Sequence, residues 1–186
     1  MGLWYEAHFC LRGGRCDVFA GQNTVPPKTG SGEDPQNSIL IIFVSVKIKE
    51  IFALGRKYRW PRPAFCPRCG DSRVWGHGFT LAYFDGCSEG VLLRRYRCPG
   101  CGCVIRLRPG GYFPRFQATI ETIRFSLSHR LNRGRWPPGL SRPRQRHWLR
   151  ALRRRTIAYL GETWTRGLMG AFDWFLHQGA IPVSRM

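Results

Sequence analysis

Four cysteines arranged as two matching pairs are the residues of this chain best suited to metal chemistry. The pairs read Cys66-Pro-Arg-Cys69-Gly and Cys98-Pro-Gly-Cys101-Gly, with 28 residues between Cys69 and Cys98. Two thiolates three positions apart can bind one ion if the chain turns tightly between them, and proline and glycine favour such a turn. Two such pairs complete a tetrahedral four-thiolate site, the usual arrangement of structural zinc. The spacing therefore predicts one structural zinc ion bound by Cys66, Cys69, Cys98 and Cys101.

Disulfide bonding, or burial as ordinary thiols, is the alternative use of these cysteines. It does not explain why both pairs have the same proline and glycine neighbours. The first ten residues lack the basic start and apolar core of a signal peptide, so we expect no oxidising compartment. Two further ligand candidates are Cys103, expected at the start of a strand, and His77, expected in a turn between strands. The other cysteines are expected to be free thiols: Cys10, Cys16 and Cys87.

The net charge of the chain indicates a polyanionic partner. Lys and Arg number 30 against 11 Asp and Glu, which gives a formal charge of +19. A protein this positive concentrates near polyanions, so nucleic acid is the first candidate and an anionic membrane the second. The longest apolar stretch, Ile39 to Val46, is far shorter than the roughly 20 residues of a membrane helix. We therefore expect a cytoplasmic protein with nucleic acid as its partner and no membrane.

Arginine is concentrated in one segment near the end of the chain. Between Thr122 and Gly161 there are eleven arginines and no acidic residue. A helix is predicted from Ser141, a good N-cap, to Leu160. One side of this helix would be packed, through Trp148, Leu149, Leu152, Thr156, Tyr159 and Leu160. The other would be cationic and suited to lie along duplex DNA, with these candidate contacts: Arg142, Arg144, Arg146, His147, Arg150, Arg153 and Arg154.

A solvated charged face is the alternative interpretation of this helix. A merely solvated helix normally mixes charges of both signs, however, and this one does not. A second arginine cluster, between the cysteine pairs and just after them, could contact a nucleic-acid backbone or simply be the exposed side of a hairpin. It comprises Arg94, Arg95, Arg97, Arg106 and Arg108, with Tyr96 among them.

The pattern along the chain predicts a small α+β protein. Residues 1–38 are rich in Gly, Pro, Ser and Asp and predict a poorly ordered leader. Residues 39–60 predict a strand followed by a short helix from Lys47 to Tyr58. Residues 61–109 predict a zinc ribbon of short antiparallel strands, at 73–75, 79–84, 91–97 and 104–107.

The remaining predicted segment, 117–179, is a basic helical region. Ile120, Ile123, Leu127 and Leu131 share one helical face. The loop Arg133 to Leu140 then separates this helix from the arginine-rich one, and it is longer than the turn of a compact helix-turn-helix. Trp164, Leu168, Phe172 and Phe175 predict a last helix. The fold class is thus a zinc ribbon followed by a helical, helix-turn-helix-like segment.

The order of these motifs resembles a known class of proteins. The sequence Cys66-Pro-Arg-Cys69-Gly, then Gly76-His77-Gly78, then Arg95-Tyr96-Arg97-Cys98-Pro-Gly-Cys101-Gly, followed by a basic helical region, is similar to zinc-binding proteins associated with bacterial insertion sequences. It also resembles a family of small transposase-like proteins, over roughly Val46 to Leu160. The resemblance implies a zinc ribbon with a helix-turn-helix that binds transposon ends, in the bacterial nucleoid, with a transposase or a second copy as partner.

Three classes of function compete at this point. The first is a non-catalytic, zinc-dependent DNA-binding protein of a mobile element, which recognises element ends or regulates the element. The second is an RNA- or ribosome-binding zinc-ribbon protein. The third is a remnant of a catalytic transposase. It is disfavoured because metal-assisted phosphoryl transfer needs several carboxylates, and only Glu121, Glu162 and Asp173 follow Glu89. We therefore expect no enzymatic activity.

Overall fold

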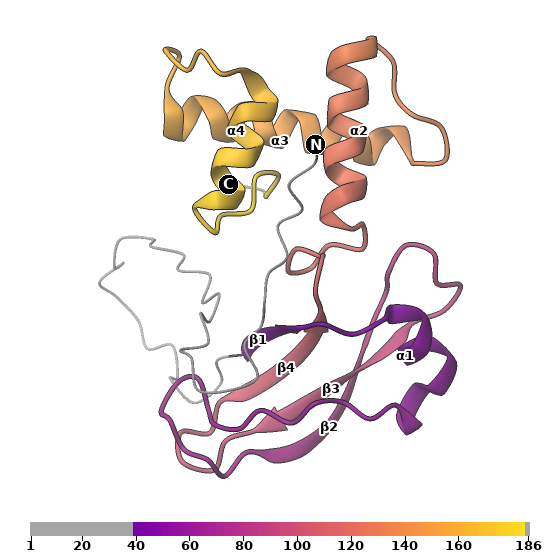
Figure 1. Ribbon diagram of the computed structural model, residues 1–186, viewed down its shortest axis with the longest axis vertical. Helices are drawn as coiled ribbons and strands as arrows, with labels where there is room; N and C mark the ends of the chain where they lie inside the picture. Colours follow the sequence, from indigo (N-terminus) through magenta and orange to yellow (C-terminus); the bar gives the residue numbers. More distant parts are fainter. Residues whose placement is uncertain (1–38, 185–186) are drawn as a thin grey trace, which may run out of the picture.

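A four-stranded sheet forms one half of the molecule and three helices form the other (Figure 1). The computed structural model describes residues 39–184, and the predicted leader, 1–38, lies outside the described residues. The sheet has the order β1-β4-β3-β2. Its strands are β1 (Ile39–Val44), β2 (Trp75–Ala82), β3 (Val91–Arg97) and β4 (Val104–Pro109). The predicted small α+β fold is confirmed.

The sheet is mixed, because β1, which was predicted as a strand outside the ribbon, joins the antiparallel ribbon strands. β2, β3 and β4 are antiparallel, but β1 pairs with β4 in parallel, with Ile39 opposite Val104 and Val44 opposite Pro109. Parallel neighbours need a long crossover connection. Here that connection contains both cysteine pairs and two other strands, so no local pattern in the sequence indicates it.

β2 is a single strand that contains a bulge. Two short strands separated by a turn at His77 were predicted here, and this is wrong. The pairing with β3 shifts register between Gly76 and Phe79, and Gly78 has a φ of 75°. A bulge adds one residue to a strand and bends it without ending it. His77 therefore lies inside a strand, at its bulge.

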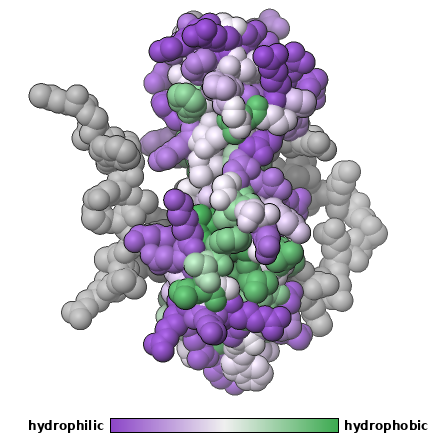
Figure 2. Space-filling model, turned by 90° about the vertical axis from the view of Figure 1, so that its right-hand side faces the viewer, coloured by the Kyte–Doolittle hydropathy of each residue, from purple (hydrophilic) through white to green (hydrophobic). Residues whose placement is uncertain are grey.

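The short helix predicted after β1 is present and packs onto β3. It consists of α1 (Ile48–Leu54), extended by the 3-10 turn η2 (Gly55–Lys57). Ile51 is fully buried and belongs to a core with Val91 and Leu93 of β3. The outer side of α1 leaves Phe52 and Leu54 exposed. Figure 2, which faces the side where α1 lies in Figure 1, shows apolar residues gathered on this half of the molecule.

The helical half contains the three helices predicted for it. They are α2 (Ile120–Arg133), α3 (Arg142–Leu160) and α4 (Gly167–His177), and α3 runs across α2 in Figure 1. Thr119 caps α2, because its hydroxyl accepts a hydrogen bond from the Thr122 N–H at 3.0 Å. Ser141 precedes α3 as predicted, but its side chain makes no capping bond. The core that joins the helices includes Ile123, Leu127, Trp148, Leu152, Phe172 and Phe175.

A buried glutamine fixes the long connection between α2 and α3. Gln145 has no exposed surface. Its amide nitrogen donates to the Leu140 carbonyl at 2.9 Å and to the Pro137 carbonyl at 3.3 Å, while its oxygen accepts from the Ser126 hydroxyl at 2.6 Å. A buried amide needs such partners. The loop is thus held to both helices by one side chain.

Polar contacts fix the two halves to each other. Arg144 of α3 makes a bidentate ion pair with Asp85, with 3.0 Å between Nη1 and Oδ1. The backbone N–H of Asp85 donates to the Gln117 carbonyl at 3.0 Å. Arg108 of β4 is buried, lies over the Phe84 ring and donates to the Phe116 carbonyl. These bonds set where α3 lies relative to the sheet.

Candidate metal centre and cationic surfaces

The two cysteine pairs fold into turns with matching hydrogen bonds. In the first turn, the Gly70 N–H donates to the Cys66 carbonyl, and the Cys66 N–H donates to the Asp71 carbonyl, both at 2.8 Å. In the second, Gly102 donates to Cys98 at 2.9 Å, and Cys98 donates to Cys103 at 3.1 Å. Gly70 and Gly102 have φ values of 77° and 71°, a region that favours glycine. The repeated sequence therefore produces a repeated structure.

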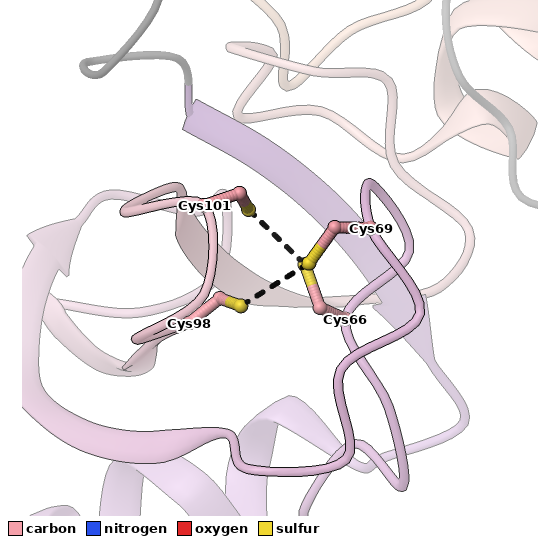
Figure 3. A group of neighbouring side chains, drawn as sticks. All are labelled: Cys66, Cys69, Cys98 and Cys101. Carbon is pink, nitrogen blue, oxygen red and sulfur yellow. Dashed lines mark hydrogen bonds between the residues drawn. The ribbon is translucent and has the colours of Figure 1, made fainter.

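These turns bring the four predicted cysteines together (Figure 3). Their four sulfur atoms all lie within 4.8 Å of one another. Cys66 and Cys101 sulfurs are 3.7 Å apart, and those of Cys69 and Cys98 are 3.5 Å apart. Zinc–sulfur bonds of about 2.3 Å in a tetrahedron place the sulfurs about 3.8 Å apart. The cluster therefore fits a metal ion such as zinc.

The cluster lies between the hydrophobic core and solvent. Cys66 and Cys98 are fully buried, Cys101 is half-buried and Cys69 is exposed. The two buried thiols pack with side chains from three strands and from the segment before β2, among them Leu40, Val74, Tyr96, Ile105 and Leu107. An ion at this position would tie both turns to the sheet core.

Backbone N–H groups, burial and the neighbouring thiols together drive the pKa values of these cysteines apart. The Cys103 backbone N–H is the main cause that lowers the pKa of Cys101, to about 6. Burial opposes ionisation of Cys66, but the N–H groups of Cys69 and Arg68 outweigh it and lower its pKa. The Asp71 N–H favours the Cys69 thiolate, yet the Cys98 sulfur and burial raise its pKa to about 12. Neighbouring thiolates repel, so a cation is needed for all four to ionise together.

Cys103 is a fifth sulfur at the edge of the cluster. It is fully buried, and its sulfur lies 3.4 Å from that of Cys66. Burial, followed by the nearby Cys66 and Cys101 sulfurs, raises its pKa. It directly precedes β4, close to where the sequence placed it. Cys103 was named as a further ligand candidate, and its sulfur lies beside the cluster but outside the group of four whose sulfurs all lie within 4.8 Å of one another.

Asp71 lies between the two turns and was not among the predicted site residues. Its carboxylate accepts from the Arg73 backbone N–H at 2.8 Å and forms an ion pair with the Arg73 guanidinium. The Arg73 guanidinium lowers the pKa of Asp71, mainly through its hydrogen bonds and to a smaller extent through its charge. Asp71 also lies against Gly100 of the other turn, where an added Cβ would come within 2.6 Å of its Oδ2. A larger residue at position 100 would therefore force the Asp71 carboxylate to move.

The predicted cationic helix has the two faces expected of it. Trp148, Leu149, Leu152 and Thr156 are buried, and five arginines are exposed on the opposite side: Arg142, Arg146, Arg150, Arg153 and Arg154. Arg144 lies elsewhere, in its ion pair with Asp85, and His147 is half-buried. Tyr159 was expected on the packed side, but 63% of it is exposed and only an edge-on contact joins it to Phe175. It lies in the last turn of α3, where the core ends.

No helix in the described part of the chain combines the length and the apolar character needed to cross a membrane. Comparison of the chain with protein-family models, with curated proteins and with solved structures gives no match. The candidate site is therefore defined by its own geometry: a four-cysteine cluster that could hold a metal ion, and a helix with an arginine-rich face.

Proposed function

We propose that this chain is a zinc-stabilised, non-catalytic protein that binds duplex DNA through α3. One observation carries the proposal: α3 exposes Arg142, Arg146, Arg150, Arg153 and Arg154 on one side. The ion pairs found among residues 39–184 involve none of these five side chains. Their spacing of three or four positions makes a stripe about 18 Å long, at a rise of about 1.5 Å per residue.

This arrangement is unfavourable for the protein alone. Like charges at three- or four-residue spacing each destabilise a helix by about 0.2–0.5 kcal/mol. Arg142 also lies in the first turn of α3, which contains no acidic residue, although the helix dipole favours negative charge there. Phosphates would relieve both effects and would release counterions on binding. This favours a polyanion as the partner over a face that is only solvated.

The metal has a structural role in this proposal. The four cysteines would fill all the positions of a tetrahedral zinc ion, which leaves none for substrate or water. A sheet half of this size buries little apolar surface, and structural zinc adds on the order of 10–16 kcal/mol of apparent binding energy. Zinc would thus hold the sheet that positions α3 through the contacts of Asp85 and Arg108.

The biological setting follows from the motif resemblance. It implies a mobile-element protein that recognises element ends or regulates the element, with α2 and α3 in a helix-turn-helix-like role. A structured RNA is the second candidate partner, since arginine-rich helices also bind RNA. A catalytic role is disfavoured because the carboxylates of Asp85 and Asp173 are engaged with Arg144 and Arg124, and within residues 39–184 no carboxylates gather into a group that could hold a metal ion.

Binding to duplex DNA by a triple variant tests the proposal. Arg146, Arg150 and Arg153 are changed to Ala together, and affinity is measured by fluorescence anisotropy over a range of salt concentrations. The matched control removes the same charge from another exposed segment, by changing Arg56, Lys57 and Arg59 to Ala. We expect the α3 variant to bind more weakly and its log–log salt slope to flatten by about 0.9 for each phosphate that it no longer neutralises.

Equal duplex binding by the α3 variant and the control variant would contradict the proposal. A structured RNA that displaces the duplex at much lower concentration would favour the RNA-binding alternative. A magnesium-dependent nicking assay on the same duplex tests catalysis separately.

A further inference from the structure

We infer that a hollow beside the second cysteine turn binds an unpaired nucleotide, with the base on Trp75 and the phosphate on Arg97. The hollow measures about 430 Å³. Its lining includes Trp75 and His77 of β2, Arg97 of β3 and Pro99 of the cysteine turn. This site lies on the sheet, whereas the proposed duplex contact lies on α3, so the inference goes beyond the proposed function.

Trp75 provides a stacking surface. It is 59% exposed, whereas the five other tryptophans of residues 39–184 are half-buried or buried. It is the first residue of β2, just before the bulge at 76–79, and bulges are used to redirect side chains near binding sites. Every nucleobase has a flat face that can stack on an exposed indole, so such a contact needs no particular sequence.

Arg97 lies at the right place for the phosphate. It is directly opposite Trp75 in the antiparallel pairing, and it is exposed. Opposite side chains on one sheet face have Cβ atoms about 5 Å apart. That separation suits a base and its own phosphate, which are joined through one sugar. Arginine also binds phosphate with two parallel hydrogen bonds, which fixes the orientation of the nucleotide.

Two further arginines extend the positive charge along the same face. Arg95 precedes Arg97 by two positions and is paired directly with Arg106 of β4. Like charges in this position destabilise a sheet. The Nε atoms of Arg95 and Arg106 are buried without a hydrogen-bond partner, and the ion pairs of residues 39–184 include neither arginine. A nucleic-acid strand that continues from the hollow would supply phosphates to this pair.

A single strand fits these features better than a duplex does. In a duplex, the base faces are already stacked on one another and cannot reach Trp75. An unpaired strand has free base faces. A protein site that combines base stacking with contacts to the phosphate backbone binds such a strand with little sequence preference. The unpaired nucleotide could belong to DNA or RNA, and the two sources are separated below by the probe used.

The test compares Trp75→Ala with a matched control, Tyr83→Ala. Tyr83 is 58% exposed and does not line the hollow. Binding of fluorescent oligo-dT and oligo-rU is measured by anisotropy, with blunt duplex DNA as the third probe. We expect Trp75→Ala to weaken single-strand binding roughly 5- to 150-fold, the range for one stacked base. Tyr83→Ala should bind as the unchanged protein does, and duplex binding should be unaffected by either change.

Arg97→Ala gives a second measurement that does not depend on Trp75. Without the Arg97 guanidinium on its phosphate, the salt slope for oligo-dT should fall by about 0.7, whereas Arg56→Ala should leave it unchanged. Equal single-strand binding by Trp75→Ala and Tyr83→Ala would overturn the inference. If Trp75→Ala no longer unfolds cooperatively, Arg97→Ala decides instead, and an unchanged salt slope for oligo-dT in that variant would overturn the inference. Failure of the α3 proposal is distinct, since it appears only in duplex binding by the Arg146, Arg150 and Arg153 variant.

Discussion

Replacing Arg150 with Gln should stabilise the folded protein and weaken its binding to DNA. Arg150 is exposed in the middle of α3, with Arg146, Arg153 and Arg154 at three- or four-residue spacing. Each of the three like-charge pairs is unfavourable by about 0.2–0.5 kcal/mol, so their removal should stabilise the fold by about 0.6–1.5 kcal/mol at low ionic strength. Glutamine has nearly the helix propensity of arginine, so little else changes.

Urea unfolding followed by circular dichroism measures this effect. With a slope of about 1–3 kcal/mol per molar urea, the midpoint of Arg150→Gln should rise by several tenths of a molar at low salt. The gain should shrink in about 0.5 M NaCl, because salt screens exposed charges. The salt slope for duplex DNA should at the same time fall by about 0.9, as expected if Arg150 meets phosphate.

Arg124→Gln is the matched control, with the opposite sign. Arg124 is an exposed arginine of α2, but its guanidinium donates two hydrogen bonds of 3.0 Å to Asp173 of α4. Its replacement should therefore lower the midpoint by a modest amount, since exposed ion pairs contribute about 0–1 kcal/mol. A lower midpoint for Arg150→Gln at low salt would refute the reasoning, because it would show that Arg150 has a favourable partner in the free protein.

Three further outcomes are expected. Cys98→Ser should abolish the binding of one zinc per chain and unfold the sheet half, whereas Cys103→Ser should keep stoichiometric zinc; metal analysis with far-ultraviolet circular dichroism checks both. Gln145→Leu should destabilise the fold by about 1–3 kcal/mol in urea, because it leaves buried carbonyls without their donor. Asp85→Ala should release Arg144 and shift the backbone amide resonances of α3 in an NMR spectrum. Unchanged resonances would show that this ion pair does not hold the two halves together.

Much of the local structure could be predicted from the sequence. The four clustered cysteines were identified because their chemistry depends on spacing within short, repeated turns. β3 and α3 matched their predicted bounds because the period of their buried residues is strong, and glycine or proline ends them. The position of β1 could not be predicted, because its pairing with β4 depends on residues distant in sequence.

The polar contacts, too, depend on residues that are distant in the sequence. In the sequence, Gln145 is an ordinary polar residue of an arginine-rich helix. It is nevertheless fully buried, because the loop before α3 folds back and offers its carbonyl oxygens to the Gln145 amide. Arg144 was grouped with the candidate DNA contacts, yet Asp85, far away in the sequence, forms an ion pair with it. Trp75 gave no signal until its exposure was known. Partners brought by tertiary structure decide each of these cases.

The parallel pairing of β1 with β4 has a consequence for how the chain folds. It closes the largest sequence separation in the sheet, from Ile39 to Val104, whereas β2, β3 and β4 join through short connections. Closing a long loop has an entropic cost that must be met before its contacts form. Binding of a metal ion by the two cysteine turns would first shorten the loop between β1 and β4. We therefore expect β1 to pair with β4 late in folding, and the refolding rate of the protein to depend on zinc. Hydrogen exchange should then find the β1 amides among the first of the sheet to open.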